Sequence, residues 1–161
     1  EWKNTRSMTS QFKNDEVLLT SWLSVIGLIV MQWSGVERAI DQCLHLLQQR
    51  SPIKNKKPTR LGSKLEIIAR DMPSQAISPA DFDSLRNRTK KTVRIRDILV
   101  HGMLISYDKT QMTLGKTTGI SEVHAIEEFV IDGSVLDKSL QELIDISDQW
   151  SSIVFSLIEK Q

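Results

Sequence analysis

The residues best suited to chemistry lie in the segment Arg94 to Gly102, which reads RIRDILVHG. Asp97 and His101 are four residues apart, so on a helix they share one face, where the carboxylate can orient the imidazole. Arg94, seven residues before His101, joins that face. A group that titrates near neutrality beside fixed positive charge suits cleavage of a phosphodiester by an adjacent 2′-hydroxyl without a metal. The segment therefore predicts a site for phosphoryl chemistry.

Arg96 is the most unusual residue of this segment, because it falls on the register of the apolar residues Leu85 and Leu99. An unpaired guanidinium on a face that packs against the core or a partner is unfavourable, so Arg96 needs a partner. Glu37, in the first expected helix, could pair with it as a structural partner or a helper. Five residues of straight helix turn Arg96 and His101 apart by roughly 140°. We therefore expect a two-fold homodimer that brings two third helices together, so that Arg96 and His101 of both chains line one cleft.

Basic residues surround the segment. Net charge is near zero, with 21 Lys and Arg against 20 Asp and Glu, but residues 86–96 contain no acid. A phosphate backbone would favour such a stretch, although a charge run is also typical of a solvated surface. We predict that RNA is bound by four of these side chains: Arg88, Lys90, Lys91 and Arg94.

Four helices are expected to position these residues. After a polar arm, residues 1–14, the apolar spacing predicts one long helix from Asp15 to Gln49. The segment from Pro52 to Pro58 has the composition of a loop. A second helix carries the stripe Leu61, Leu65, Ile68 and Met72; a third begins at Ser78-Pro79 and ends before Gly102; and a last begins near Ser134, with Asp137 completing a capping box.

Between the last two helices the pattern alternates, which predicts a small β-hairpin over Met103 to Leu114 with a turn at Asp108-Lys109. Residues Glu122 to Ile131 could form a third short strand or be irregular. Short connections favour antiparallel neighbours. The sequence thus predicts a single all-α domain over residues 1–161, an antiparallel four-helix up-and-down bundle with a β-hairpin inserted between the third and fourth helices.

Cysteine and histidine usage argues against a metal or cofactor. The single cysteine, Cys43, excludes an internal disulfide framework and indicates a reducing compartment, which predicts a cytoplasmic protein. His45 and His124 have no cysteine or carboxylate partner at ligand spacing, so no metal site is predicted. Phosphate loops and dinucleotide fingerprints are absent from the sequence.

The stretch from Val17 to Val36 has no charged residue and approaches the length of a membrane span. Serine, threonine and glutamine interrupt it, and its flanks are the acidic Glu16 and Glu37 instead of basic anchors. We therefore expect a deeply packed central helix, with no membrane partner.

The segment RDILVHG resembles the R-(polar)-x3-H signature of the HEPN superfamily, and the helical layout is similar across most of the chain. The resemblance implies an endoribonuclease that leaves a cyclic phosphate, in a toxin–antitoxin, phage-defence or RNA-surveillance setting, with an inhibitory protein partner that blocks the cleft. It implies His101 as general acid or base, Arg96 as the group that stabilises phosphate charge, and Asp97 as orienting residue. Asp97 departs from the asparagine that is frequent at this position.

Two other interpretations remain open. His101 at a helix C-terminus is favoured as a cation by the helix dipole whatever its function, and Asp97 with His101 could be a surface pair alone. The same bundle could also be a catalytically silent module that binds RNA, a nucleotide or a protein, with Arg96 holding helices together. A metal-stimulated nuclease is a weaker third, because acids do not cluster near the segment.

Overall fold

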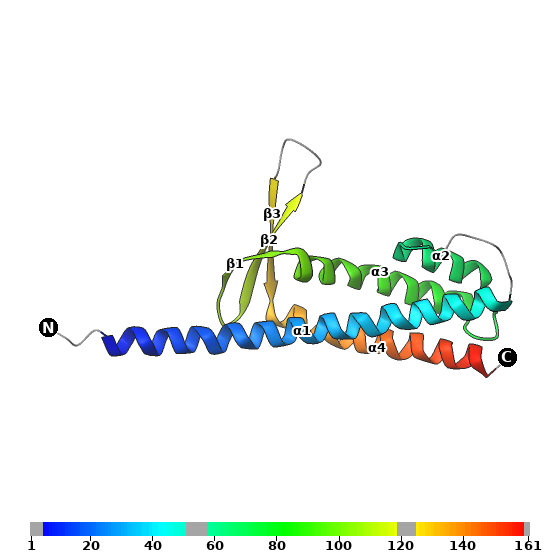
Figure 1. The fold of residues 1–161 in the computed structure, drawn as a ribbon, viewed down its shortest axis with the longest axis horizontal. Coiled ribbons are helices and arrows are strands. Elements are labelled where there is room, and N and C mark those ends of the chain that lie inside the picture. Colours follow the sequence, from blue (N-terminus) through cyan, green and yellow to red (C-terminus); the bar gives the residue numbers. More distant parts are fainter. Residues whose placement is uncertain (1–4, 51–57, 119–124, 160–161) are drawn as a thin grey trace.

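The computed structural model describes residues 5–50, 58–118 and 125–159, which form an elongated, mostly helical molecule with one small sheet (Figure 1). Residues 51–57, which include most of the predicted loop from Pro52 to Pro58, lie outside the described part. The elements in chain order are α1 (Thr5–Arg50), α2 (Leu61–Asp71), α3 (Pro79–His101), β1 (Met103–Tyr107), β2 (Gln111–Thr118), β3 (Ala125–Asp132) and α4 (Gly133–Ile158).

The prediction of an up-and-down four-helix bundle is wrong. Figure 1 shows α4 running in the same direction as α1, with α3 antiparallel to both. The reason is the length of α2, whose 11 residues span only about 16 Å and cannot return the chain along the 46-residue α1. α3 makes that return instead, and the chain then passes through a sheet before α4 begins.

The sheet has three antiparallel strands in the order β1-β2-β3, one more than a hairpin. The third strand settles the alternative left open for residues Glu122 to Ile131, of which residues up to 124 lie outside the described part. β2 pairs with β3 along its whole length, from Gln111 with Asp132 to Thr118 with Ala125. The two buried side chains of β2, Met112 and Leu114, face the helices, so the sheet covers one end of the helical core.

Local signals place both ends of α3 as predicted. The Ser78 hydroxyl accepts a hydrogen bond from the Asp81 amide at 3.2 Å, which caps the first turn. At the other end, a Cβ on Gly102 would lie 2.5 Å from the Ile98 carbonyl oxygen and 3.0 Å from Leu114 Cβ. Only glycine therefore lets β2 lie against the last turn of α3.

Two other helix starts differ from prediction. α4 is capped by Asp132, whose carboxylate accepts from the Ser134 amide at 2.7 Å, so Ser134 is not the cap. The hydrogen bonds lower the pKa of Asp132 below its usual value. α1 begins at Thr5 and not at Asp15, because residues 5–14 contain neither glycine nor proline to end a helix.

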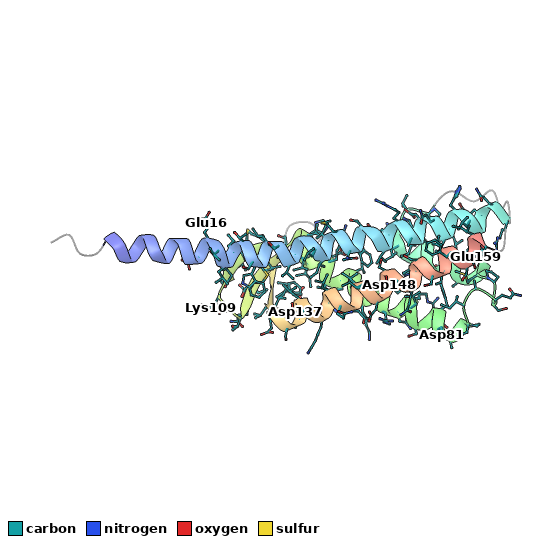
Figure 2. All side chains as sticks on the ribbon, turned by 90° about the horizontal axis from the view of Figure 1, so that it is seen from below. Glu16, Asp81, Lys109, Asp137, Asp148 and Glu159 are labelled. Atoms are coloured by element: carbon teal, nitrogen blue, oxygen red, sulfur yellow. The ribbon has the colours of Figure 1, made fainter. Side chains whose placement is uncertain are left out.

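α1 is packed on one side only. From Asp15 to Arg50 it is long and apolar enough to cross a membrane by length and composition, a test that core helices of soluble proteins also pass, but only 17 % of its most apolar window is buried. Trp22 and Trp33 are buried, whereas Leu23 and Met31 are exposed. In Figure 2, Glu16 points away from the side on which the sheet and α4 lie. The expectation of a deeply enclosed central helix is therefore wrong.

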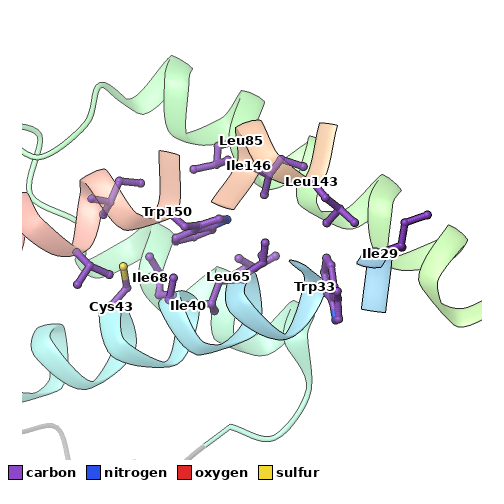
Figure 3. Packing of buried hydrophobic residues seen from close by; sticks show 14 of the residues in the cluster. Ile29, Trp33, Ile40, Cys43, Leu65, Ile68, Leu85, Leu143, Ile146 and Trp150 are labelled. Atoms are coloured by element: carbon purple, nitrogen blue, oxygen red, sulfur yellow. The ribbon is translucent and has the colours of Figure 1, made fainter. Parts of the chain in front are cut away.

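The core lies between α1, α3 and α4, around Trp150 (Figure 3). The Trp150 indole is fully buried, packs edge-on against Phe82 with ring centroids 5.9 Å apart, and donates a hydrogen bond to the Thr89 hydroxyl at 3.1 Å. Cys43 lies in the same core, and burial raises the pKa of its thiol to about 12. Cys43 is thus a buried packing residue whose thiol stays protonated near neutral pH.

We expect Thr89→Val to destabilise the protein by about 1–3 kcal/mol, because the buried Trp150 N–H loses its acceptor while side-chain volume is kept. Thr92→Val is the matched control, since the buried Thr92 hydroxyl also donates to a carbonyl one turn earlier but accepts no side-chain hydrogen bond among the described residues. Urea unfolding followed by circular dichroism measures both. Equal destabilisation by the two variants would contradict the assignment.

Candidate functional site

The C-terminal half of α3 presents a polar stripe that contains four of the predicted residues. Lys90, Arg94, Asp97 and His101 recur at four- and three-residue steps, so they share one face of the helix. Lys90, Arg94 and His101 are exposed, and Asp97 is half-buried. His101 is the last residue of α3, directly before Gly102. The structure thus places the Asp97 carboxylate, the His101 imidazole and two cations on one face of α3.

Arg96 lies at the edge of this stripe, on the register of the buried residues of α3 as predicted. Its side chain is 26 % exposed, and its Nη1 donates to Asp97 Oδ1 at 3.0 Å. Its Nε is buried and has no hydrogen-bond partner within the described residues. Glu37 is half-buried in α1 and forms no ion pair with Arg96 in the part of the chain that is described, so the partner of Arg96 is its own neighbour in sequence.

A groove of about 260 Å³ separates this part of α3 from the sheet. Arg94 and Asp97 line its helical wall, and Lys116 of β2 with Glu127 and Phe129 of β3 line the opposite wall. The lining of the groove therefore contains two cations and two carboxylates together with apolar side chains. The site has no excess of positive charge, which limits how strongly it attracts a phosphate backbone.

Sequence reasoning missed Lys116. The signal was present, because Met112, Leu114 and Lys116 alternate along β2 and share the face that looks toward the helices. A cation on the buried face of a strand calls for a nearby acid or a ligand. Identifying it also required knowing that this face packs beside α3 at the level of Asp97, which is a tertiary relation.

Arg88 and Lys91 lie on a different side of α3, toward α4. The Arg88 guanidinium donates to both carboxylate oxygens of Glu142, at 2.5 and 3.1 Å, and lies 3.9 Å from Asp145. This hydrogen bond lowers the pKa of Glu142 and raises the pKa of Arg88. Lys91 lines a separate groove with Glu142. These two predicted RNA contacts are therefore not on the stripe that carries Asp97 and His101.

Metal ligands do not gather around the stripe. Within the described residues there is no group of three or more His, Cys, Asp and Glu side chains that could hold a metal ion. His45 is exposed on α1 and hydrogen-bonds Gln49 at 2.9 Å, while His124 lies outside the described residues. A larger groove of about 700 Å³, between α1 and α4, is lined by Arg38, Asp41, His45 and Phe155 and includes no residue of α3.

No protein-family model, curated protein or solved structure gives a significant match to this chain. The chemistry of the stripe is therefore argued from its own geometry. That geometry places the exposed imidazole of His101 on the same helix face as the carboxylate of Asp97, and the guanidinium of Arg96 contacts that carboxylate.

We expect Glu142→Gln to lower stability by up to about 1 kcal/mol at pH 7, because the partly exposed pair with Arg88 is lost. Since the pKa of Glu142 is lowered in the folded protein, its stabilising effect is present above the unfolded pKa and is lost as pH falls through the folded pKa. The difference from the parent should therefore vanish in acid. Urea titrations from pH 7 to pH 3 test this, with the exposed, unpaired Asp148→Asn as control; a constant difference would contradict it.

Proposed function

We propose that the protein is a metal-independent endoribonuclease of the HEPN type that acts as a cytoplasmic homodimer. The observation that carries the proposal is the stripe on α3, where Asp97 and the exposed His101 share one face and the guanidinium of Arg96 is held beside Asp97 at 3.0 Å. The spacing R-D-x3-H and the glycine that follows it are what the HEPN resemblance rests on.

In the proposed reaction, the 2′-hydroxyl attacks the adjacent phosphorus, the bond to the 5′-oxygen breaks, and the products are a 2′,3′-cyclic phosphate and a 5′-hydroxyl end. His101 transfers the proton that leaves the 2′-hydroxyl or reaches the departing 5′-oxygen. Arg96 stabilises the charge on the pentacoordinate phosphorane through its Nη groups. Asp97 positions the guanidinium by the 3.0 Å hydrogen bond. No redox or metal step is needed for this balance.

A second chain completes the proposed site. Arg96 lies on the inward register of α3, whereas His101 lies on the outward stripe, so one helix does not converge the two side chains on a single phosphate. A cleft shared by two chains would place His101 of one chain near Arg96 of the other. The exposure of His101 in a single chain is consistent with a residue that becomes enclosed only on assembly.

A silent binding module is the second candidate, and two observations favour it. Arg96 is already paired with Asp97, and Arg88 is engaged by Glu142, so both guanidiniums have structural partners. In this version the groove lined by Arg94 and Lys116 binds RNA, a nucleotide or a protein without cleaving it. The toxin–antitoxin or phage-defence setting and an inhibitory protein partner belong to the ribonuclease proposal and follow from the resemblance alone.

We expect the protein to cleave single-stranded RNA in excess EDTA, with cyclic-phosphate ends, and we expect Arg96→Ala and His101→Ala each to slow cleavage by at least about 100-fold. Matched controls are Arg70→Ala, which breaks a similar pair of neighbouring Arg and Asp in α2, and His45→Ala, another exposed helical histidine. Equal cleavage by the parent and both site variants would identify a contaminant and leave the binding module.

Mixing the two inactive variants tests the shared cleft. A dimer of one Arg96→Ala chain and one His101→Ala chain contains one complete site and one empty site, so an equimolar mixture should regain about a quarter of parental activity. Cleavage rates of the separate and mixed variants, after denaturation and refolding together, measure this. Activity in the parent without recovery in the mixture would place both residues of each site in one chain.

We expect Asp97→Asn to lower the KM for RNA several-fold, because it removes a negative charge beside Arg96 while keeping an oxygen that accepts its hydrogen bond. Asp71→Asn is the matched control, since it breaks the equivalent pair with Arg70 in α2. Steady-state kinetics across pH 6–8 measure both variants. A fall in kcat with unchanged KM would show that the charge of Asp97 acts on the reaction itself.

A further inference from the structure

A solvent-facing stripe on α1 is left uncovered by the described part of the chain. Seven positions recur at four- and three-residue steps along it, and all seven residues are exposed: Glu16, Thr20, Leu23, Gly27, Met31, Ser34 and Arg38. Glu16, Gly27 and Arg38 are separated by 11 residues each, which is close to three full turns, so the stripe stays on one face over about 33 Å. Leu23 and Met31 are 55 % and 71 % exposed.

The hydroxyls on this stripe are already satisfied. Thr20 Oγ1 donates to the Glu16 carbonyl at 2.8 Å, and Ser34 Oγ donates to the Val30 carbonyl at 3.0 Å. Ser24, beside the stripe, bonds the Thr20 carbonyl in the same way. Covering these groups therefore leaves no hydroxyl donor without an acceptor, which removes the usual penalty for burying serine or threonine.

The stripe is complementary to itself when reversed. The steps from Gly27 are four, three and four residues in both directions, so an antiparallel copy centred on Gly27 places Leu23 opposite Met31 and Thr20 opposite Ser34. The two ends of the stripe then form pairs of opposite charge, because Glu16 of one chain faces Arg38 of the other. Within the described residues neither Glu16 nor Arg38 forms an ion pair in its own chain.

We propose that α1 pairs with α1 of a second copy of this chain in an antiparallel, two-fold arrangement centred on Gly27. No side-chain atom lies within 4 Å of a Cβ placed on Gly27, so a second helix can approach closely there. A two-fold axis requires the same patch on both chains, and this stripe meets that requirement. The inference stands on α1 and does not rest on the ribonuclease proposal.

The pairing also has a consequence for α3. Trp22 Nε1 donates to the Asp108 carbonyl at 2.9 Å, which holds the turn between β1 and β2 against this part of α1. Trp22 is buried on the face of α1 that packs against the rest of the chain, opposite the stripe, so the pairing places α3 of each chain on the outer side of the dimer. A cleft that shares Arg96 and His101 between two chains would form through a different surface, so the α1 contact and the shared cleft are tested separately.

A lipid bilayer is the competing occupant, and the rest of the fold disfavours it. The opposite face of the same segment packs against the sheet and α4, as Trp22 and Trp33 show by their burial. Crossing a membrane would carry Lys109 and Asp137, which lie on the packed side of α1 in Figure 2, into the hydrocarbon or break this packing. Lying flat on a membrane calls for flanking basic residues, whereas the stripe begins at Glu16, directly after Asp15.

Sedimentation equilibrium on the whole chain, with charge reversals, tests the proposal. We expect a dimer in the parent, a rise of about tenfold in its Kd for Glu16→Arg or Arg38→Glu, and recovery in the double variant, because both cross-chain pairs are then restored. Met31→Lys should also dissociate the dimer, whereas the control Val130→Lys, at an equally exposed apolar residue of β3, should not.

Three results would overturn the proposal. The first is a monomer at all concentrations, and the second is a dimer whose Kd the single reversals leave unchanged. The third is a monomer that floats with vesicles of phosphatidylcholine and phosphatidylserine and loses this binding in Met31→Lys, which would assign the stripe to a membrane. A dimer that does not cleave RNA would support the α1 contact and contradict the ribonuclease proposal. A monomer that cleaves RNA would support the ribonuclease activity and contradict the α1 contact.

Discussion

The buried hydrogen bond between Trp150 and Thr89 is the contact on which the arrangement of the three long helices depends. Trp150 comes from α4 and lies in the core against α1, while its indole N–H is accepted by α3 at 3.1 Å. A tryptophan that fills this space must orient its N–H toward an acceptor, and the Thr89 hydroxyl offers one. Together with the burial of Leu85 and Leu99, this bond determines which side of α3 faces the core, and hence the side to which Arg94, Asp97 and His101 face.

What the sequence predicted correctly was encoded locally. Ser78 before Pro79, and Gly102 after His101, define α3 by chemistry that operates within a few residues, and both ends are confirmed. The first two strands were predicted from alternation, which is also local. The antiparallel bundle was wrong because it assumed that each helix returns the chain along its neighbour, whereas the short α2 cannot. Helix length is visible in the sequence, whereas the direction of each helix depends on how the helices pack.

The sequence predicted which residues form the candidate site, but it did not predict which of their charged side chains pair with each other. The stripe of Asp97 and His101 followed from helical spacing, and the structure places both on the same face. The choice of Asp97 over Glu37 as partner of Arg96 depends on the distance between α1 and α3, which periodicity does not report. The same holds for Arg88, whose partner Glu142 is 54 residues away, and for Lys116, which meets α3 only through the sheet.

Gly102 joins the helical and β parts of the molecule through main-chain atoms. Because Gly102 has no Cβ, the Leu114 side chain of β2 packs directly against the backbone at the end of α3. The position of the sheet is therefore tied to the end of α3, directly after His101. A larger residue at position 102 would push β2 away from α3 and widen the groove in which Lys116 of β2 faces Asp97 of α3.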